Sequence, residues 1–349
     1  MKWFIAWFLP FCMLFSSAEA PVSTPSSARN YIVYDPNSSE ILEGKDYEDV
    51  YSVASISKIM TAVLALESTS LFEIVTVGDI IYSIEGSSLY LEVGDRITLI
   101  DLVYGLLLRS GNDAAVLIAE TVSGSVEKFV ESMNAKAAEI GMEDTVFHNP
   151  SGLDIFDEGN LSTCLDMARL MAYCLGNELF REIVATKNYR SPLKGNWANK
   201  NKLLQTYEYC IGGKTGYTRK ARRTLVTAGE KDGQELIVVT FSCGNDFEVH
   251  RNLYEHYFND FTYLVFLEKG ENRIDDYCIY SEKVVGMRLD KAVKKGVKIY
   301  YLNPILNRLT IRFVDEKGEE YTLNAEFEIF YTGSRERISV SVHRIYRTI

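Results

Sequence analysis

The chain has too little positive charge to bind nucleic acid over a broad surface. Its 349 residues include 37 Lys and Arg against 48 Asp and Glu, which gives a formal net charge of -11. A phosphate backbone must be neutralised by clustered Lys and Arg side chains, and the acidic balance argues against broad electrostatic binding of this kind. We therefore expect no nucleic-acid partner.

The chain also lacks the spacings of common metal sites. Its six cysteines include no Cys-x-x-Cys pair, and its four histidines include no His-x-x-x-His pair. We therefore expect no metal and no cofactor. Five cysteines follow Cys12, namely Cys164, Cys174, Cys210, Cys243 and Cys278. An odd number allows at most two disulfides, and we interpret these thiols mostly as small buried hydrophobes.

Long apolar runs are scarce, and the clearest one lies at the start of the chain. Residues 1–20 contain Lys2, an apolar run from Trp3 to Phe15, and the small residues Ala18 and Ala20. This order is typical of a secretory signal peptide, and the run is shorter than the roughly 20 residues that span a bilayer. We expect cleavage after Ala20 and an exported chain that acts in the cell envelope. Membrane contact, if any, would be peripheral, and the sequence offers no support for it.

What the chain does contain is the composition of a globular protein, with 47% apolar and 24% charged residues. At roughly 150 residues per domain, its length predicts two domains. Residues 28–267 are predicted to form an α+β domain in which strands flank a helical middle. After the polar segment 268–272, alternating apolar residues predict a small β-rich domain over 273–349.

Periodicity predicts the main elements of both domains. Helices are expected over 55–67, 99–108, 113–122, 126–140, 164–175 and 255–266, the last of which would close the first domain. Strands are expected over 31–34, 235–241, 309–314, 321–323 and 338–345.

The segment Ser55-Ile56-Ser57-Lys58 could carry chemistry, because it places a hydroxyl and an amine three residues apart at the expected start of a helix. Both side chains then lie on one helical face, where the amine can act as the base of the serine. The base must be neutral, and burial lowers the pKa of a lysine from its reference of about 10.4. The apolar run from Ile59 to Leu66 predicts such burial.

The spacing alone is weak evidence. Ser125 with Lys128, and Ser191 with Lys194, have the same spacing among charged residues and turns. A second segment, Ser110-Gly111-Asn112, offers a hydroxyl and an amide, although Asn112 could equally be a helix cap.

A third segment, Lys214-Thr215-Gly216, offers a cation and a hydroxyl beside a residue without a side chain. At a strand edge, such a segment could hold a carboxylate while substrate backbone pairs alongside. An ordinary glycine turn is the alternative.

In this order the three segments resemble the signature of penicillin-recognising serine enzymes. The similarity to low-molecular-weight D-alanyl-D-alanine carboxypeptidases is carried by residues 54–61, 85–88, 106–115, 149–153, 166–168, 199–203 and 213–218. It covers about residues 28–265. The resemblance implies a β-lactamase/transpeptidase-like catalytic domain, an antiparallel sheet with helices, followed here by the small β-rich domain.

The resemblance also implies a reaction and roles for residues. The enzyme would remove the terminal D-alanine from peptidoglycan stem peptides ending in D-Ala-D-Ala, and β-lactam antibiotics would inhibit it covalently. Ser55 would be the nucleophile and Lys58 its general base. Ser110 would pass a proton to the leaving amine, and Asn112 would hold the substrate amide.

On the strand, Lys214 and Thr215 would hold the terminal carboxylate, and Gly216 would let the substrate approach. The backbone N–H groups of Ser55 and Tyr217 would form the oxyanion hole. Arg251 is a further candidate for the carboxylate, chosen only by its position before the expected closing helix.

Some features depart from the family pattern. Arg222 stands where the family usually has glycine, and Asn160-Leu161-Ser162 replaces the more usual His-Tyr-Ser. The C-terminal residues alternate like a strand, whereas many relatives end in an amphipathic helix. A β-lactamase-like hydrolase and a non-catalytic wall-binding homologue remain as alternatives. A Ser-His-Asp hydrolase fits less well, because the resemblance needs none of the histidines.

Overall fold

The computed structural model describes residues 27–154, 159–274, 277–281, 284–291, 295–303, 308–326, 328–332, 335–340 and 346–348. The expected signal peptide and Cys12 therefore lie outside the described residues. Within them, every cysteine is a free thiol, and all but Cys278 are buried. The interpretation of these thiols as small hydrophobes is confirmed.

A five-stranded antiparallel sheet forms the centre of the larger lobe, in the order β2-β1-β11-β10-β9. Its strands are β1 (Asn30–Asp35), β2 (Glu40–Lys45), β9 (Cys210–Thr218), β10 (Arg222–Lys231) and β11 (Gln234–Phe241). The apolar strand β11 is buried along its whole length. Strand β9 lies at an edge of the sheet, so one side of its backbone faces no other strand.

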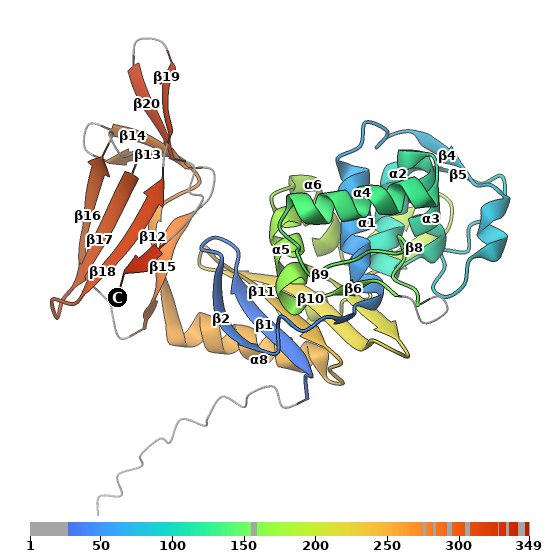
Figure 1. Ribbon diagram of the computed structural model, residues 1–349, viewed down its shortest axis with the longest axis horizontal. Coiled ribbons are helices and arrows are strands. Elements are labelled where there is room, and N and C mark those ends of the chain that lie inside the picture. Colours follow the sequence, from blue (N-terminus) through green and yellow to red (C-terminus); the bar gives the residue numbers. More distant parts are fainter. Residues whose placement is uncertain are drawn as a thin grey trace, which may run out of the picture.

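Helices cover both faces of this sheet (Figure 1). Helix α8 (Asp246–Asp260) lies on one face, where its apolar residues share a core with Leu236 and Val238 of β11. The other face packs against α5 (Cys164–Leu175) and α6 (Glu178–Ala185) in a larger core that includes Ile237 and Val239. Alternate residues of one strand thus stabilise two separate layers.

The helical region surrounds α1 (Lys58–Leu66), most of whose residues are buried. A 3-10 turn, η1 (Ala54–Ser57), precedes it. Around it lie α2 (Leu99–Tyr104), the π-helical turn η3 (Gly105–Arg109), α3 (Asn112–Ser123) and α4 (Val126–Glu139). The expected helices between residues 55 and 175 are therefore confirmed, with small differences at their ends.

Short elements complete this lobe. They are β3 (Tyr51–Ser52) with β6 (Leu161–Ser162), β4 (Ile74–Thr76) with β5 (Arg96–Thr98), β7 (Asn188–Ser191) with β8 (Gly195–Ala198), η2 (Asp79–Ser83) and α7 (Leu203–Thr206). No helix in the described part of the chain is both long and apolar enough to cross a membrane.

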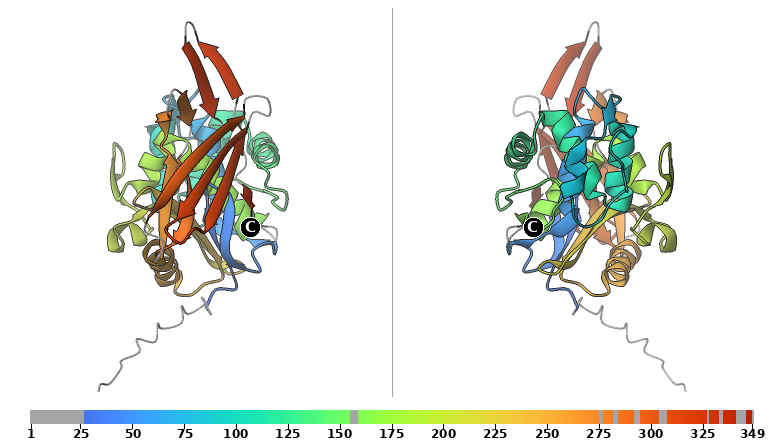
Figure 2. Two further views of the ribbon diagram at one scale, coloured as in Figure 1. Left: turned by 90° about the vertical axis from the view of Figure 1, so that its left-hand side faces the viewer. Right: turned by 90° about the vertical axis from the view of Figure 1, so that its right-hand side faces the viewer.

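The described residues of the C-terminal part are mostly in strands, as expected, although residues 341–345 of the strand expected over 338–345 lie outside the described residues. Strand β12 (Phe261–Leu267) pairs with β15 (Val285–Asp290). A second sheet has the order β13-β14-β20-β19, and a third has the order β16-β17-β18-β21. Their bounds are β13 (Gly270–Ile274), β14 (Tyr277–Ser281), β16 (Gly296–Asn303), β17 (Arg308–Asp315), β18 (Glu320–Glu326), β19 (Glu328–Thr332), β20 (Arg335–Val340) and β21 (Tyr346–Thr348). The hairpin of β19 and β20 projects beyond the other strands (Figures 1 and 2).

The expected closing helix over 255–266 is wrong in its second half. Helix α8 begins at Asp246 and ends at Asp260, and residues from Phe261 onward form β12. The run Phe-Thr-Tyr-Leu-Val-Phe-Leu is rich in aromatic and β-branched residues, which favour strands. Strand β12 pairs with β15 of the C-terminal part. The division of the chain into residues 28–267 and 273–349 stays a prediction.

An almost buried ion pair joins the two parts. Arg288 on β15 lies 3.0 Å from the carboxylate of Asp35, at the end of β1, and both side chains are nearly inaccessible. The same carboxylate accepts hydrogen bonds from the backbone of Asn37 and Ser38. The β-rich part is therefore attached at the end of the sheet that is remote from η1 (Figure 1).

Candidate active site

The turn that carries Ser55 is held in an unusual conformation. Ala54 has a φ of 52°, in the left-handed region that favours glycine. The loop with Gly152 presses against this turn, since a Cβ on Gly152 would lie 2.0 Å from the carbonyl oxygen of Ala54. Gly152 itself has a φ of 75°. A residue without a side chain is therefore required there for two independent reasons.

The amine of Lys58 has three neighbours. Its Nζ lies 3.0 Å from Ser55 Oγ and 2.8 Å from Asn112 Oδ1, and it also contacts the carbonyl oxygen of Ser151. Two of these groups can only accept hydrogen bonds, whereas the hydroxyl can also donate. A neutral amine, with two N–H donors and one lone pair, satisfies all three contacts. Its lone pair would then face the Ser55 proton.

Burial favours this neutral form. Lys58 has no exposed surface, and its pKa is lowered to about 7, mainly by burial and further by the charge of Lys200. Asp113 opposes this shift only in part. A large fraction of Lys58 is therefore able to accept a proton near neutral pH.

Asn112 and Asp113 hold the second segment beside the first. The Nδ2 of Asn112 donates to the carbonyl oxygen of Glu85 at 2.6 Å, which directs its Oδ1 toward Lys58. The carboxylate of Asp113 accepts hydrogen bonds from Leu89 N and Ser88 Oγ. Asn112 makes no cap of α3, so the capping alternative considered for it is wrong.

Ser110 connects this segment to strand β9. It has a φ of 66° at the end of η3, and its Oγ accepts a hydrogen bond from Lys214 Nζ at 3.0 Å. Lys214 also donates to the carbonyl oxygen of Thr215 at 2.7 Å. Burial, together with the charges of Lys58 and Lys200, holds the pKa of Lys214 well below its usual range.

Gly216 lets strand β9 approach the nucleophile turn. A Cβ at this position would lie 2.3 Å from Thr224 Oγ1 and 3.0 Å from the backbone nitrogen of Ser55. Any side chain would therefore push β9 away from Ser55. Tyr217, the next residue, is 61% exposed and lies at the rim of the site.

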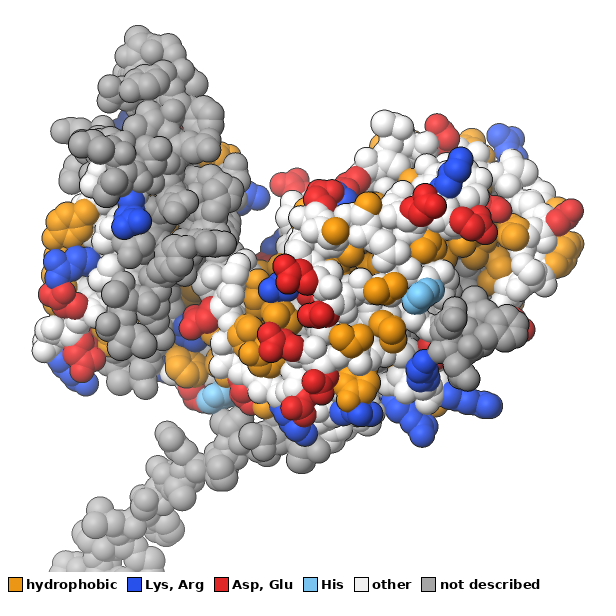
Figure 3. All heavy atoms as spheres, in the orientation of Figure 1, with side chains coloured by type: hydrophobic (Ala, Val, Ile, Leu, Met, Phe, Trp, Pro, Cys, Tyr) orange, Lys and Arg blue, Asp and Glu red, His pale blue; other side chains and the backbone are white. Residues whose placement is uncertain are grey.

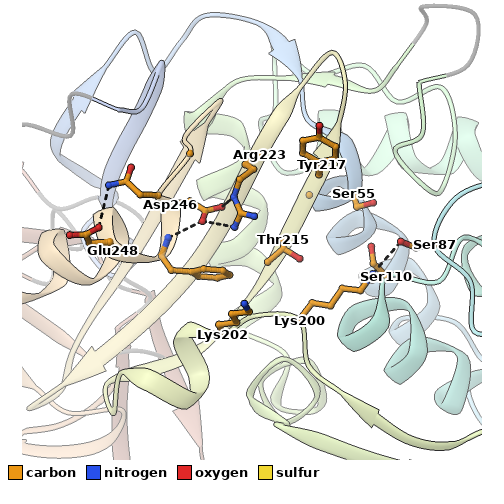
Figure 4. Close-up of a pocket in the computed structure, with 14 residues that line it drawn as sticks. Ser55, Ser87, Ser110, Lys200, Lys202, Thr215, Tyr217, Arg223, Asp246 and Glu248 are labelled. Carbon is orange, nitrogen blue, oxygen red and sulfur yellow. Dashed lines mark hydrogen bonds and ion pairs between the residues drawn. The ribbon is translucent and has the colours of Figure 1, made fainter.

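These segments enclose a pocket of about 620 Å³ at the edge of the sheet (Figure 4). It is lined by Ser55, Ser87, Ser110, Lys200, Lys202, Thr215, Gly216, Tyr217, Arg223, Gly244, Asn245, Asp246, Phe247 and Glu248. The other predicted site residues, Lys58, Asn112 and Lys214, are buried behind this lining. The structure thus brings all of the predicted site residues together, with the exception of Arg251.

This arrangement can be compared with known proteins. The family model for D-alanyl-D-alanine carboxypeptidases matches residues 16–245 of the chain. The chain belongs to this family. Carboxypeptidase DacF of Bacillus subtilis is 29% identical over 306 residues, which cover 84% of this chain and 74% of that protein. Because the match is longer than the larger lobe, it extends into the β-rich part.

Solved structures of D-alanyl-D-alanine carboxypeptidases and related enzymes share the fold. A D-alanyl-D-alanine carboxypeptidase of Mycobacterium tuberculosis has a TM-score of 0.65 and 31% identity, covering 69% of this chain and 94% of that one. A penicillin-binding protein of Listeria monocytogenes, solved in its ampicillin-bound form, has a TM-score of 0.62 and 27% identity, covering 67% of this chain and 98% of that one.

Other residues that matched patterns in the sequence lie elsewhere. Arg251, the further candidate for the carboxylate, is outside the pocket lining, with its guanidinium 5.9 Å from the ring centre of Tyr207. That expectation is therefore not supported. His250 is buried between Thr227 and Thr240, and burial lowers its pKa to about 3, so it stays neutral.

Several residues of this carboxypeptidase site carry no recognisable signal of their role in the sequence. Lys200 donates a hydrogen bond to Ser87 Oγ at 3.2 Å. These two residues lie in segments 199–203 and 85–88, which contribute to the family resemblance without indicating a role for either residue. The backbone carbonyl of Ser151 contacts Lys58, and backbone groups carry no sequence signal of their own. Arg223 lies on β10 and lines the pocket. The alternation of side chains along the strands that follow Lys214 could have indicated the direction of the Arg223 side chain.

Proposed function

We propose that the protein is a serine-type D-alanyl-D-alanine carboxypeptidase in which Ser55 forms an acyl-enzyme. The observation that carries this proposal is the contact of the fully buried Lys58 amine with the Ser55 hydroxyl, which lines the pocket. An amine with a pKa of about 7 can accept the serine proton near neutral pH. The hydroxyl then becomes a nucleophile that opens into the pocket.

In the first step, Ser55 Oγ attacks the carbonyl carbon between the two D-alanines, and its proton moves to Lys58 Nζ. The negative charge on the carbonyl oxygen is stabilised by the backbone N–H groups of Ser55 and Tyr217. Ser110, hydrogen-bonded to Lys214, donates its proton to the leaving amine and is reprotonated by Lys58, so that D-alanine departs and the Lys58 amine is neutral again. Water then attacks the ester and gives a proton to the neutral Lys58 amine, which passes it to Ser55 Oγ as the acyl group leaves.

The substrate lies along the free edge of β9 in this proposal. Asn112 contributes to binding of the substrate amide, and Gly216 leaves room for the peptide backbone beside the strand. Thr215 lies beside the terminal D-alanine that leaves, and Lys214 lies behind Thr215. A β-lactam ring presents a strained amide to the same serine, so penicillins acylate Ser55 and block it. The ampicillin-bound relative supports this part of the proposal.

The mature protein, beginning after Ala20, would act on peptidoglycan outside the cytoplasmic membrane. We propose that the β-rich C-terminal part, predicted as residues 273–349, positions the catalytic lobe at a set distance from its surroundings. The ion pair of Arg288 with Asp35 supports a firm attachment between the two parts.

The test uses the purified chain from residue 21 to 349 and its Ser55→Ala variant. Intact mass is measured after incubation with benzylpenicillin, and D-alanine release is followed from diacetyl-Lys-D-Ala-D-Ala. We expect a stable adduct and D-alanine release in the wild type, with both lost in Ser55→Ala. Ser125→Ala is the matched control and should retain both.

Two other results would change the assignment. Rapid turnover of penicillin without D-alanine release would indicate a β-lactamase-like hydrolase. Folded protein that gives neither an adduct nor D-alanine, yet binds muropeptides, would indicate a non-catalytic wall-binding homologue.

A further inference from the structure

Tyr90 combines two features that rarely occur together. Its side chain is 78% exposed, and its backbone has a φ of 62°, in the left-handed region. A bulky residue is an outlier there, because its Cβ crowds the following carbonyl oxygen. Among the described residues, its ring stacks on no other ring and its hydroxyl forms no hydrogen bond. The strain therefore serves no contact of this side chain within the protein, and strain of this kind concentrates at functional sites.

The residues before Tyr90 hold this conformation. The backbone N–H of Leu89 donates to the Asp113 carboxylate at 2.8 Å, and the Leu89 side chain is buried in the larger core. The backbone N–H of Tyr90 donates to Ser88 Oγ at 2.8 Å, and Ser88 donates in turn to Asp113 at 2.7 Å. Because Leu89 is anchored inward, the chain turns at Tyr90 and directs its ring into solvent.

The same segment forms one wall of the pocket. Ser87 lines the pocket, and Figure 4 shows it across from Thr215 of β9. The carbonyl oxygen of Ser87 accepts a hydrogen bond from the backbone N–H of Asn112 at 2.7 Å, so this wall is fixed to the site. Tyr90 follows Ser87 by three residues, which span at most about 11 Å. Its exposed ring therefore lies close to the mouth of the pocket.

The charge of the segment restricts the kind of partner. Residues 79–95 include four acidic residues and no Lys or Arg. An anionic lipid surface is attracted by cations and would be repelled by this segment. Glu92, two residues after Tyr90, has a side chain that is 82% exposed, and beside its contact with Lys194 it keeps lone pairs for other donors. An aromatic ring near such an acceptor fits a neutral, hydroxyl-rich ligand.

A sugar ring has this chemistry. Its C–H groups form apolar faces that stack on a tyrosine ring, and its hydroxyls donate to carboxylates. In peptidoglycan the stem peptide is joined to a sugar, and four residues of a stem pentapeptide precede the bond that is cleaved. Fully extended, these four residues span at most about 14 Å. A sugar joined to a bound stem peptide can therefore reach the ring of Tyr90.

We propose that Tyr90 forms a subsite for the glycan of peptidoglycan, by stacking on the sugar that carries the stem peptide. The enzyme would thereby prefer stem peptides that are joined to sugar over free stem peptides. This inference rests on the proposed function, because the pocket must hold the stem peptide for the sugar to reach Tyr90.

The test compares a disaccharide-pentapeptide with the same pentapeptide lacking the sugars, with D-alanine release as the readout. Tyr90→Asn removes the ring and introduces a residue that tolerates a left-handed backbone. It should lower kcat/KM for the disaccharide-pentapeptide by about 3- to 10-fold, mostly through a higher KM. The free pentapeptide should change less than about twofold. Tyr90→Phe should keep the preference, because the ring remains.

The thermal midpoint separates binding from stability. Tyr90→Gly should raise the midpoint by on the order of 2 °C, since glycine adopts a positive φ without strain. The same variant should lose the preference for the sugar-bearing substrate. Tyr280→Asn is the matched control, since Tyr280 is 45% exposed on β14, in the C-terminal part. It should leave the preference unchanged.

Each outcome bears on a defined claim. If the wild type cleaves both substrates without preference, or folded Tyr90→Asn keeps the wild-type preference, the inference is wrong and the proposed function stands. Tyr90→Asn could instead change only the oligomeric state or the binding to phosphatidylglycerol vesicles, which would assign the ring to a second copy or to a lipid surface and overturn the inference. If the folded wild type cleaves neither substrate, the proposed function fails, and the inference fails with it.

Discussion

Two helices of this protein begin with the same spacing of serine and lysine, and they differ in almost every other respect. At α4, Ser125 has an extended backbone, and its Oγ accepts a hydrogen bond from the backbone N–H of Lys128 at 3.3 Å. Lys128 itself extends into solvent. At η1 and α1, Ser55 lies inside the 3-10 turn, and its Oγ contacts the amine of Lys58.

The difference shows what makes a reactive pair. An N-cap serine uses its oxygen to satisfy a backbone donor of its own helix, so the hydroxyl is not available to an amine. Ser55 does not act as an N-cap, because the turn already begins at Ala54, whose backbone is left-handed. The lysine at α1 is then covered by α3 and by the loop with Ser151, whereas α4 lies at the surface. Figure 3 shows charged side chains along that outer face.

The largest effect that would test this comparison is on acylation. Ser55→Ala should lower the rate of penicillin acylation by about 10⁴-fold or more, because no other hydroxyl occupies the place of the nucleophile. Ser125→Ala should leave the rate unchanged. Stopped-flow kinetics or mass spectrometry of quenched samples would measure the acylation rates of both variants. Comparable loss in both variants would contradict the comparison.

The second prediction concerns pH. Lys58 must be neutral to accept the proton, and its pKa is about 7. Acylation should therefore fall about tenfold per pH unit below pH 7 and level off above it. Because the charge of Lys200 helps to lower the pKa of Lys58, Lys200→Gln should move the midpoint upward by on the order of half a unit to one unit. A midpoint that stays fixed, or moves down, would contradict this assignment.

A third prediction uses two glycines, one near each helix. Both Gly152 and Gly124 have positive φ, but only Gly152 would bring a Cβ against other atoms. Gly152→Ala should destabilise the fold by on the order of 2 to 4 kcal/mol and slow acylation, since it displaces the Ala54 turn and the Ser151 carbonyl. Gly124→Ala should cost only the backbone strain, about 1 kcal/mol.

Denaturant unfolding and acylation rates measured on the same samples separate these effects. Equal destabilisation by the two glycine substitutions would mean that the loop with Gly152 moves aside for the added methyl group at little cost in free energy. The Ser55 turn would then not depend on that loop.

The smallest effect concerns the cap of α4. Ser125→Ala should lower the free energy of unfolding by about 1 kcal/mol, because it leaves the N–H of Lys128 without its partner. Ser55→Ala should change stability less, since Ser55 caps no helix. Thermal unfolding of the two variants would show the order. The reverse order would mean that the Ser55 hydroxyl has a structural role that its contacts do not indicate.

Much of the fold follows from local pattern. The helices over 99–108, 113–122 and 126–140 and the strand over 235–241 match observed elements within a few residues. The helix expected over 255–266 is wrong in its second half, because an apolar run with aromatic and β-branched residues fits either structure until its partner strand is known. Strand β15, about 20 residues further along the chain, decides the outcome for β12.

The sequence by itself determined which residues could react. Three short segments held hydroxyls, amines and an amide in an order shared with a known family, and the apolar run after Lys58 predicted its burial. The acidic balance of the sequence also argued against broad binding of nucleic acid, and the common metal spacings are absent from it. These properties depend on residue type and on near neighbours along the chain.

Only the tertiary structure decided how these groups face one another. The neutral Lys58 depends on the Asn112 amide and the Ser151 carbonyl, which come from distant segments. The place of Arg223 depends on Asp246, across the junction of β10 and α8. Spacing along one helix was equal at Ser55 and Ser125, so the environment, rather than the motif, distinguishes a base from a surface lysine. Contacts and hydrogen bonds between distant segments set that environment, and no single segment encodes them.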